Sequence, residues 1–523
     1  MNKLFRLCLN KTCLLLLGLF CFFFMIPPLA GSDAGMRDLA ISDAVEDELA
    51  GDIWVPQAQI DVVTQDGIVT LQGSVDHVLA KDRATRIAEM VRGVRGVVNQ
   101  IKVSPSMAYD DKEILTKVEA ALKDDPAAED LEIDVKVMDG TVLLSGEVDS
   151  QSEKILAENV TKGVRGVKAV ENKIGLDVPY ISQRPDSEIR KDIEERLRWD
   201  VLVDHGQIDV DVNKGTVILS GTVGSAAEKT RAILDAQVAG MDRIDASGLK
   251  AEKWERDDAF RKDKYVVKTD EEIQKAVQDA FSYDPRVAPF QGHVDVDSGM
   301  VTLRGQVDNL KAKRAATRDA MNTVGVIAVK NRLKVRPGEK LPDDTVTDKV
   351  RAALRRSPHV DLYDVDVTNR QGVVTVSGTV DTHAQRAVAS DLASGIKGVL
   401  MVINHITVRD DMPLVYNPYL DDWYAYGYTD YEERKTLKSD EQIKESVKRE
   451  LWWSPFVDSD DINVTVEKGA VTLTGKVDSW PEYQIAAENA FQGGATWVYN
   501  LLACETCVEG PPSASYPLER WMR

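Results

Sequence analysis

Two cysteines near the end of the chain, Cys504 and Cys507, have the C-x-x-C spacing of redox pairs and of some metal sites. A redox pair needs a helix N-terminus to lower the thiol pKa, but a strand-like run precedes this one. One C-x-x-C lacks the remaining ligands for zinc, and no histidine follows Cys507 for haem attachment. We therefore predict a local disulfide between Cys504 and Cys507 in an oxidising compartment, with no metal site and no cofactor.

Paired aspartates are the other residues whose spacing could support chemistry. Asp209 and Asp211 share one face of a predicted strand, as do Asp295 and Asp297. Such pairs can act as acid and base or hold Ca²⁺, yet the same alternation is typical of the wet face of an antiparallel hairpin. The chain has no G-x-S-x-G elbow and no phosphate-cradling loop before a helix. The six histidines fall at unmatched places, so we predict no enzymatic activity: His77, His205, His293, His359, His383 and His405.

Basic side chains gather on two predicted helices. One helix, after Asn309, carries four bases before its first acid: Lys311, Lys313, Arg314 and Arg318. A second, in repeat 1, carries Lys81, Arg83 and Arg86 against Asp82 and Glu89. Lys311, Arg314 and Arg318 share one helix face because they are spaced three and four residues apart. If exposed, these residues are candidate contacts for lipid phosphates. The alternative is a solvated face whose bases offset the acids of neighbouring modules.

The overall charge limits the partners of the protein. Its 523 residues carry a formal net charge of −21 at pH 7. Nucleic acid rewards clustered Lys and Arg, so we predict no nucleic-acid partner. Non-specific adhesion to an anionic membrane is also disfavoured.

One motif, G-x-V-x-L-x-G-x-V, organises the chain and occurs six times. Its apolar residues alternate with polar ones, which is the period of a half-buried strand. The first glycine follows a turn residue and predicts a hairpin, and the second lies within the strand, where close approach of other backbone is expected. The glycines are Gly67 and Gly73, Gly140 and Gly146, Gly215 and Gly221, Gly299 and Gly305, Gly372 and Gly378, and Gly469 and Gly475.

The surroundings of the motif recur as well. A helical stripe such as Ile114, Val118 and Leu122 precedes each hairpin, and a second helix follows it. A third strand with an asparagine, such as Asn331, closes the unit; repeat 3 has Ser247 there, so we expect its third strand to be weaker or shifted. The fold class predicted is α+β, a tandem array of six αββαβ modules.

The predicted boundaries follow from this pattern. A short apolar run after three bases, ending in small residues, predicts a secretory signal peptide over residues 1–32, with an uncleaved anchor as the alternative. Residues 409–438 form a linker rich in aromatic and acidic residues, and residues 508–523 a flexible tail. The repeats span 37–103, 110–177, 186–251, 269–335, 343–408 and 439–504.

The repeat resembles the BON domain, a module of bacterial periplasmic osmotic-shock and outer-membrane-maintenance proteins. The strand motif and the closing G-V-x-x-V-x-N-x-[ILV] of residues 166–174, 325–333 and 398–406 carry the resemblance. It implies a three-stranded sheet with two helices on one face. It also implies association with phospholipid membranes or envelope components, and no catalysis.

The function expected from the sequence is therefore that of a non-enzymatic periplasmic protein. Its expected partners are membrane phospholipid or envelope proteins, in envelope maintenance, osmotic shock or another stress response. The alternative is a scaffold for cell-wall glycan or protein partners, with the aromatic linker as the contact. If the N-terminal segment stays uncleaved, the protein is anchored in the inner membrane.

Overall fold

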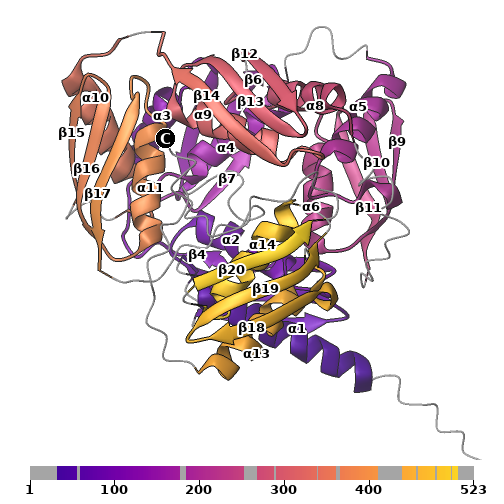
Figure 1. Ribbon diagram of the computed structural model, residues 1–523. Helices are drawn as coiled ribbons and strands as arrows, with labels where there is room; N and C mark the ends of the chain where they lie inside the picture. Colours follow the sequence, from indigo (N-terminus) through magenta and orange to yellow (C-terminus); the bar gives the residue numbers. More distant parts are fainter. Residues whose placement is uncertain are drawn as a thin grey trace, which may run out of the picture.

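The chain folds as six copies of one small α+β module (Figure 1). Each copy runs helix, strand, strand, helix, strand, which confirms the predicted αββαβ array. The computed structural model describes residues 32–52, 54–55, 59–176, 184–238, 240–252, 268–287, 290–338, 340–360, 365–409, 439–454, 457–477, 480–495 and 497–504.

The first three repeats contain the following elements. Repeat 1 has α1 (Ser32–Gly51), β1 (Ile60–Gln65), β2 (Ile68–Val75), α2 (Val78–Glu89), β3 (Gly96–Asn99) and β4 (Lys102–Val103). Repeat 2 has α3 (Asp111–Asp124), β5 (Ile133–Met138), β6 (Thr141–Val148), α4 (Gln151–Lys162), β7 (Ala169–Asn172) and β8 (Gly175–Leu176). Repeat 3 has α5 (Asp186–Trp199), the 3₁₀ helix η3 (His205–Gln207), β9 (Ile208–Asn213), β10 (Thr216–Val223), α6 (Ala226–Asp235) and β11 (Arg243–Ala251).

The last three repeats keep this order. Repeat 4 has α8 (Asp270–Tyr283), β12 (Gln291–Asp297), β13 (Met300–Val307), α9 (Leu310–Met321) and β14 (Ala328–Val335). Repeat 5 has α10 (Asp343–Arg356), β15 (Val365–Arg370), β16 (Val373–Val380), α11 (His383–Ser394) and β17 (Met401–Val408). Repeat 6 has α13 (Asp440–Trp453), the 3₁₀ helix η5 (Ser459–Asp461), β18 (Ile462–Glu467), β19 (Ala470–Val477), α14 (Trp480–Gln492) and β20 (Trp497–Cys504).

Each sheet is mixed. The motif strand lies in the middle, antiparallel to the strand before it and parallel to the strand that closes the repeat. In repeat 4, Val301 and Leu303 of the motif are fully buried beneath the helices, together with Phe281 of α8. Alternation along the strand thus sends one set of side chains to the helices and leaves the other set on the outer face of the sheet.

The hairpin turn of each repeat has both central residues at positive φ. In repeat 2, Asp139 has φ 52° and Gly140 has φ 78°, as a turn matched to the twist of a hairpin requires. The backbone N–H groups of both residues donate to the Asp111 carboxylate at 2.8 Å. An aspartate of the first helix holds the turn in every repeat, from the first turn of that helix in repeats 2 to 6 and from further along α1 in repeat 1, a contact that the sequence reasoning missed: Asp38, Asp111, Asp186, Asp270, Asp343 and Asp440.

The third strands differ between repeats, and in repeats 1 and 2 each is divided into two short strands, β3 with β4 and β7 with β8. The asparagine side chain of the third strand binds the second helix, as when Asn331 Nδ2 donates to the Lys313 carbonyl at 2.7 Å. In repeat 3, which has Ser247 at this place, β11 still pairs with β10, but through a register shift between Ile218 and Ser220. The third strand expected to be weaker or shifted is therefore present with an irregular register.

The six modules pack in the pairs 1 with 6, 2 with 5, and 3 with 4. The same backbone hydrogen bond joins each pair, from the loop after a second helix to the end of a first helix. The bonds are Arg92 N–H to Trp453 O (3.1 Å), Arg165 N–H to Arg356 O (2.7 Å) and Val324 N–H to Trp199 O (2.9 Å). The chain thus folds back between repeats 3 and 4, and Figure 1 shows repeat 6 beside repeat 1 at the bottom of the view.

Candidate functional site

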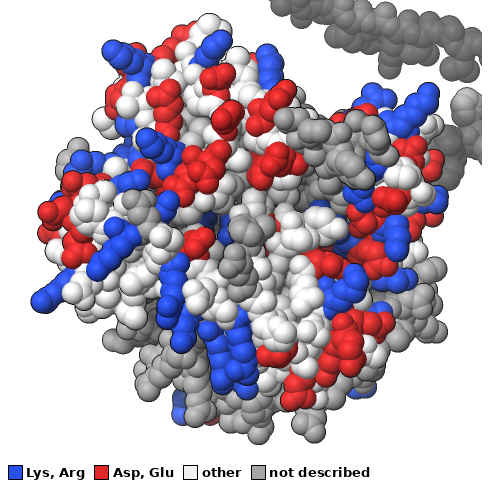
Figure 2. Space-filling view, turned by 90° about the horizontal axis from the view of Figure 1, so that it is seen from above, with Lys and Arg blue, Asp and Glu red and all other residues white. Residues whose placement is uncertain are grey.

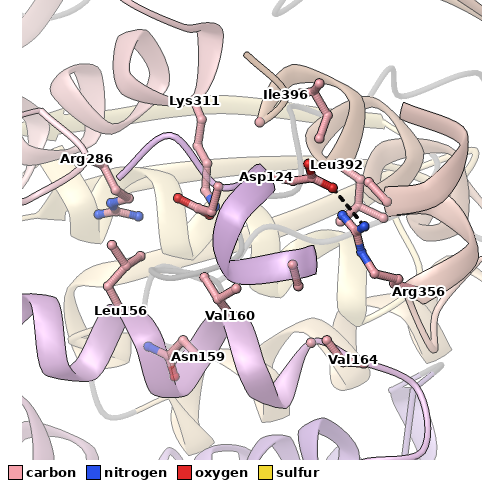
Figure 3. A pocket seen from close by; sticks show the side chains of 15 residues that line it. Asp124, Leu156, Asn159, Val160, Val164, Arg286, Lys311, Arg356, Leu392 and Ile396 are labelled. Atoms are coloured by element: carbon pink, nitrogen blue, oxygen red, sulfur yellow. Dashed lines mark hydrogen bonds and ion pairs between the residues drawn. The ribbon is translucent and has the colours of Figure 1, made fainter. Parts of the chain in front are cut away.

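A pocket of about 120 Å³ opens where helices of repeats 2, 4 and 5 meet (Figure 3). Leu156 and Val160 point into it from α4, which also contributes Asn159 to the lining, and Leu392 and Ile396 approach from the end of α11. Its charged lining comes from helix ends: Asp124, Asp125, Arg286, Lys311 and Arg356.

Ion pairs between repeats bring these helix ends together. Asp124, the last residue of α3, binds Arg356 Nη1 of repeat 5 and Lys349 Nζ at 2.8 Å each. The next residue, Asp125, binds Lys311 Nζ of repeat 4 at 3.0 Å. The side chains of Asp124 and Asp125 are only 13% and 10% exposed.

Helix dipoles explain part of this arrangement. An aspartate at the C-terminus of α3 and a lysine in the first turn of α9 each oppose the dipole of their own helix. Asn309 starts α9 by accepting the Ala312 N–H at 2.8 Å, which places Lys311 in that first turn. Pairing Lys311 with Asp125 offsets both unfavourable placements and fixes repeat 4 against repeat 2.

The charged groups of the pocket hold the repeats together by ion pairs. Its lining contains no serine, threonine, cysteine or histidine that could act as a nucleophile or base. Asp124 and Asp125 are held by cations, and Arg286 is held by Asp284. Within the described ranges, no group of three or more His, Cys, Asp or Glu side chains is arranged to hold a metal ion.

The structure places the predicted lipid contacts of α9 at this junction. Lys311 binds Asp125, and Arg314 Nη1 binds Asp391 at 3.1 Å and Ser394 at 3.0 Å in repeat 5. Both residues are thus ion-paired with acids of neighbouring repeats.

The other two predicted contacts of α9 are also partly enclosed. Burial lowers the pKa of Lys313. Burial alone would raise the pKa of Asp284, but the charges of Arg286 and Arg318 lower it, so Arg318 acts on an acid of its own repeat.

The predicted contacts of α2 lie inside repeat 1. Arg83 Nε binds Asp52 at 2.7 Å, and both side chains are buried. Lys81 and Arg86 are half-buried on the same helix, and Arg86 acts electrostatically on Glu89. Neither group of predicted contacts is an open basic face.

A basic row on β14 was missed by the sequence reasoning. Lys330, Arg332 and Lys334 are all exposed on the outer face of the repeat 4 sheet. The sequence pattern that could have predicted this row is the alternation of bases with Asn331 and Leu333 in the third strand. Figure 2 shows acidic and basic side chains interspersed over one face of the molecule, with Lys and Arg grouped in the lower middle of the view.

Two carboxyl groups meet where repeats 1 and 6 pack together. Burial, followed by the neighbouring charge of Glu450, raises the pKa of Glu48 to about 8. Burial also raises the pKa of Glu450, while its hydrogen bond with Glu48 and the charge of Arg449 lower it. Glu48 therefore holds the proton of the pair, with Asp47 and Asp52 adding further negative charge nearby.

We expect Glu48→Gln to flatten the pH dependence of stability. Between pH 4.5 and about 8 the folded wild type holds a proton that the unfolded chain releases, so its stability falls as the pH rises. Glutamine keeps a hydrogen-bond donor but cannot ionise. At pH 8 the free energy of unfolding of the variant should therefore exceed that of wild type by an amount on the order of a few kcal/mol, and the variant should melt at a higher temperature. Thermal melting between pH 6.5 and 8 measures this; equal slopes for both proteins would contradict it.

Two histidines lie where repeats 1 and 5 meet, His359 buried and His77 half-buried. The His359 ring lies 4.8 Å from the His77 ring and 4.1 Å from the Trp54 ring. Burial, with the charge of Arg165, lowers the pKa of His77 to about 4, and burial lowers that of His359. Both are neutral at pH 7. Below pH 6.5 the unfolded chain binds protons that the folded protein does not, so these histidines make stability fall as the pH falls, whereas Glu48 makes it fall as the pH rises.

Several predicted features lie outside the described residues. These are the linker apart from residue 409, the tail, Cys507, and the signal peptide apart from Ser32, where α1 begins. Cys504 ends β20, and the structure gives no account of its side chain. In the part of the chain that the structure describes, no helix combines the length and apolar character needed to cross a membrane.

Comparison with known proteins gives a consistent result for every repeat. The BON domain family matches residues 37–105, 110–176, 185–249, 269–337, 342–410 and 439–503. The osmotically-inducible protein Y of Escherichia coli is 31% identical over 145 residues, which cover 27% of this chain and 72% of that protein. The outer membrane lipoprotein DolP of Haemophilus influenzae is 34% identical over 140 residues, covering 26% of this chain and 72% of DolP.

Among solved structures, CdsD, a structural protein of the type III secretion system of Chlamydia trachomatis, aligns with 45% of this chain and 96% of its own. The identity is 15% and the TM-score 0.13. The C-terminal domain of CdsD gives a TM-score of 0.12.

Proposed function

This chain belongs to the BON-domain family, and on that premise we propose that it is a non-enzymatic adaptor of the bacterial cell envelope. In this proposal the protein is secreted by its signal peptide, works in the periplasm and binds phospholipid membrane or envelope components during envelope maintenance or stress. The observation that carries the proposal is the repetition of one BON module six times within a single packed body. The names of the two relatives, one osmotically inducible and one an outer membrane lipoprotein, support the envelope setting.

The packing of the modules is consistent with an adaptor. The helices of the repeats face one another across ion pairs and buried carboxyls, as in the junction of repeats 2, 4 and 5. The outer faces of the sheets remain available, and they differ from repeat to repeat in charge and apolar character. One body thus presents several distinct surfaces to partners.

A second candidate, a scaffold for cell-wall glycan or protein partners, is favoured by the outer row of β20. Tyr499 and Leu501 are 46% and 55% exposed, and the Trp497 ring lies 6.4 Å from that of Tyr499. Aromatic rings beside an apolar side chain give a surface that can stack on sugars or pack against a protein.

Two binding assays on the secreted full chain distinguish these candidates. We expect co-sedimentation with vesicles that contain phosphatidylglycerol, weakened by salt because exposed charges are screened. Peptidoglycan sedimentation with wild type and a Tyr499→Ser variant tests the second candidate. Binding to neither vesicles nor peptidoglycan would reject phospholipid and cell-wall glycan as the ligands and leave only protein partners.

The predicted α9 contacts remain a testable part of the proposal. Replacing Lys311, Lys313, Arg314 and Arg318 by Gln removes charge without adding repulsion. If these residues hold lipid, vesicle binding should fall while the melting temperature changes little. If their main role is to join repeats, as the contacts of Lys311 and Arg314 indicate, melting should fall and the remaining folded protein should bind as wild type does.

A further inference from the structure

The basic row of β14, defined as Lys330, Arg332 and Lys334, lies on an outer strand of the repeat 4 sheet. The alternate residues Val329 and Leu333 are buried under the helices, so the basic side chains point to the outer face. Alternate residues of a strand are about 6.8 Å apart, so the three charges form a line of regular spacing.

The row differs from the other basic clusters because its charges are not used inside the molecule. No hydrogen bond or ion pair joins the Lys330, Arg332 or Lys334 side chains to another residue in the described ranges. Lys311 and Arg314, by contrast, are each held by an aspartate of another repeat.

One residue of the row, Arg332, also lies next to a like charge on the neighbouring strand. Arg332 lies directly opposite Arg304 of β13, and like charges in such positions destabilise a sheet. Asp295 binds Arg304 at 3.0 Å and so offsets part of this repulsion, but it leaves the row itself unneutralised. A destabilising row of free cations in a chain of net charge −21 indicates an anionic partner.

The shape of the row favours a narrow partner over a broad one. The molecule as a whole carries a net charge of −21, so it repels a broad anionic surface, which approaches much of the molecule at once, more than it repels a narrow one. An extended polypeptide presents alternate side chains at the same spacing of about 6.8 Å, so carboxylates at every second residue match the three cations.

We propose that the basic row of β14 is a docking surface for an extended acidic polypeptide segment of a partner protein, with carboxylates at every second residue. Arg332, in the centre, forms the bidentate pair that guanidinium makes with carboxylate, and the two lysines act as point charges on either side. The recognition runs through side chains, because the Leu333 N–H at the middle of the strand is already bound by Asn331 Oδ1 at 3.0 Å.

The row is a property of repeat 4. At the corresponding places of β17, repeat 5 has the exposed Ile403 and also His405 and Thr407. Repeat 6 presents Tyr499 and Leu501 on β20. One strand position of the module therefore carries different chemistry in different repeats, and only repeat 4 among these three offers a line of cations.

The test uses the full chain and fluorescent synthetic peptides at low ionic strength. One peptide has glutamate at every second residue, a second has the same glutamates in one block, and a third has glutamine in their place. We expect the alternating peptide to bind with the highest affinity, measured by fluorescence anisotropy, and salt to weaken that binding. Equal binding of the alternating and block peptides would overturn the match in spacing.

A pair of variants assigns the surface. Changing Lys330, Arg332 and Lys334 to Glu should weaken binding of the alternating peptide by about tenfold or more, since each exposed ion pair contributes modestly. The control changes Lys112, Lys123 and Lys250, three exposed bases elsewhere, to Glu and alters net charge equally. Loss of binding in both variants would show a net-charge effect only and overturn the proposal.

Vesicles containing phosphatidylglycerol, used with the same variants, separate this proposal from the envelope function. If the β14 variant loses vesicle binding as strongly as peptide binding, the row is a general anion surface and the peptide proposal is wrong. If it loses the peptide and keeps the vesicles, the proposal holds. Failure of wild type on vesicles alone would count against the lipid function and leave the peptide result standing. Concentration-dependent sedimentation of wild type that the β14 variant abolishes would identify a second copy as the occupant and overturn a separate partner.

Discussion

Replacing Gly475 by alanine is expected to unfold repeat 6 at temperatures where wild type is still folded. Gly475 has φ 129°, in a region that residues with a side chain rarely adopt. An added Cβ would lie 1.9 Å from the carbonyl oxygen of Asp461, which is backbone and cannot move aside as a side chain can. Backbone strain and overpacking together should cost about 3 kcal/mol or more.

Such a loss is large for a module of this size, because small domains bury too little surface to tolerate it. Hydrogen exchange followed by mass spectrometry measures the effect locally, and the amides of β18 and β19 should lose protection first. The matched control is Gly338→Ala, where an added Cβ would meet no atom within 4 Å. Wild-type protection of β18 and β19 in the Gly475 variant would show that the strand shifts to accommodate a side chain.

Replacing Asp124 by alanine is expected to loosen the junction of repeats 2 and 5 by about 3 kcal/mol or more. The carboxylate is the shared partner of Arg356 and Lys349, and the side chains of Asp124 and Arg356 are 13% and 10% exposed. Its removal leaves a largely buried guanidinium beside an ammonium with no acid between them, which is the most damaging way to break a buried pair. Urea unfolding measures the loss as a lower midpoint.

The control for this variant is Asp134→Ala on β5, an exposed position whose loss should change stability by less than about 0.5 kcal/mol. A double variant, Asp124→Leu with Arg356→Met, removes both charges and should recover part of the stability. If Asp124→Ala unfolds at the wild-type midpoint, the ion pairs between repeats do not hold the pairs of modules together.

The fold of one module could be predicted from the sequence because local chemistry decides it. A turn with two residues at positive φ requires a residue such as Asp139 followed by Gly140. Period-two alternation places Val301 and Leu303 inward, and the helical spacing of Ile114, Val118 and Leu122 forms one buried stripe. These signals lie within a few residues of one another and recur in every copy, so repetition removed the ambiguity of any single one.

The arrangement of the modules, and with it the availability of each charge, was decided only by tertiary structure. A helix face bearing Lys311 and Arg314 has the same pattern in sequence whether it meets water, lipid or the acids of another module. The partners that decide the matter, Asp125 and Asp391, are 186 and 77 residues away along the chain. The pairing of repeat 1 with repeat 6 likewise includes a backbone hydrogen bond from Arg92 N–H to Trp453 O, which leaves no signature in the sequence. Local periodicity specifies which face of an element is polar, but the identity of what lies against that face depends on contacts between distant segments, and these form only when the modules pack together.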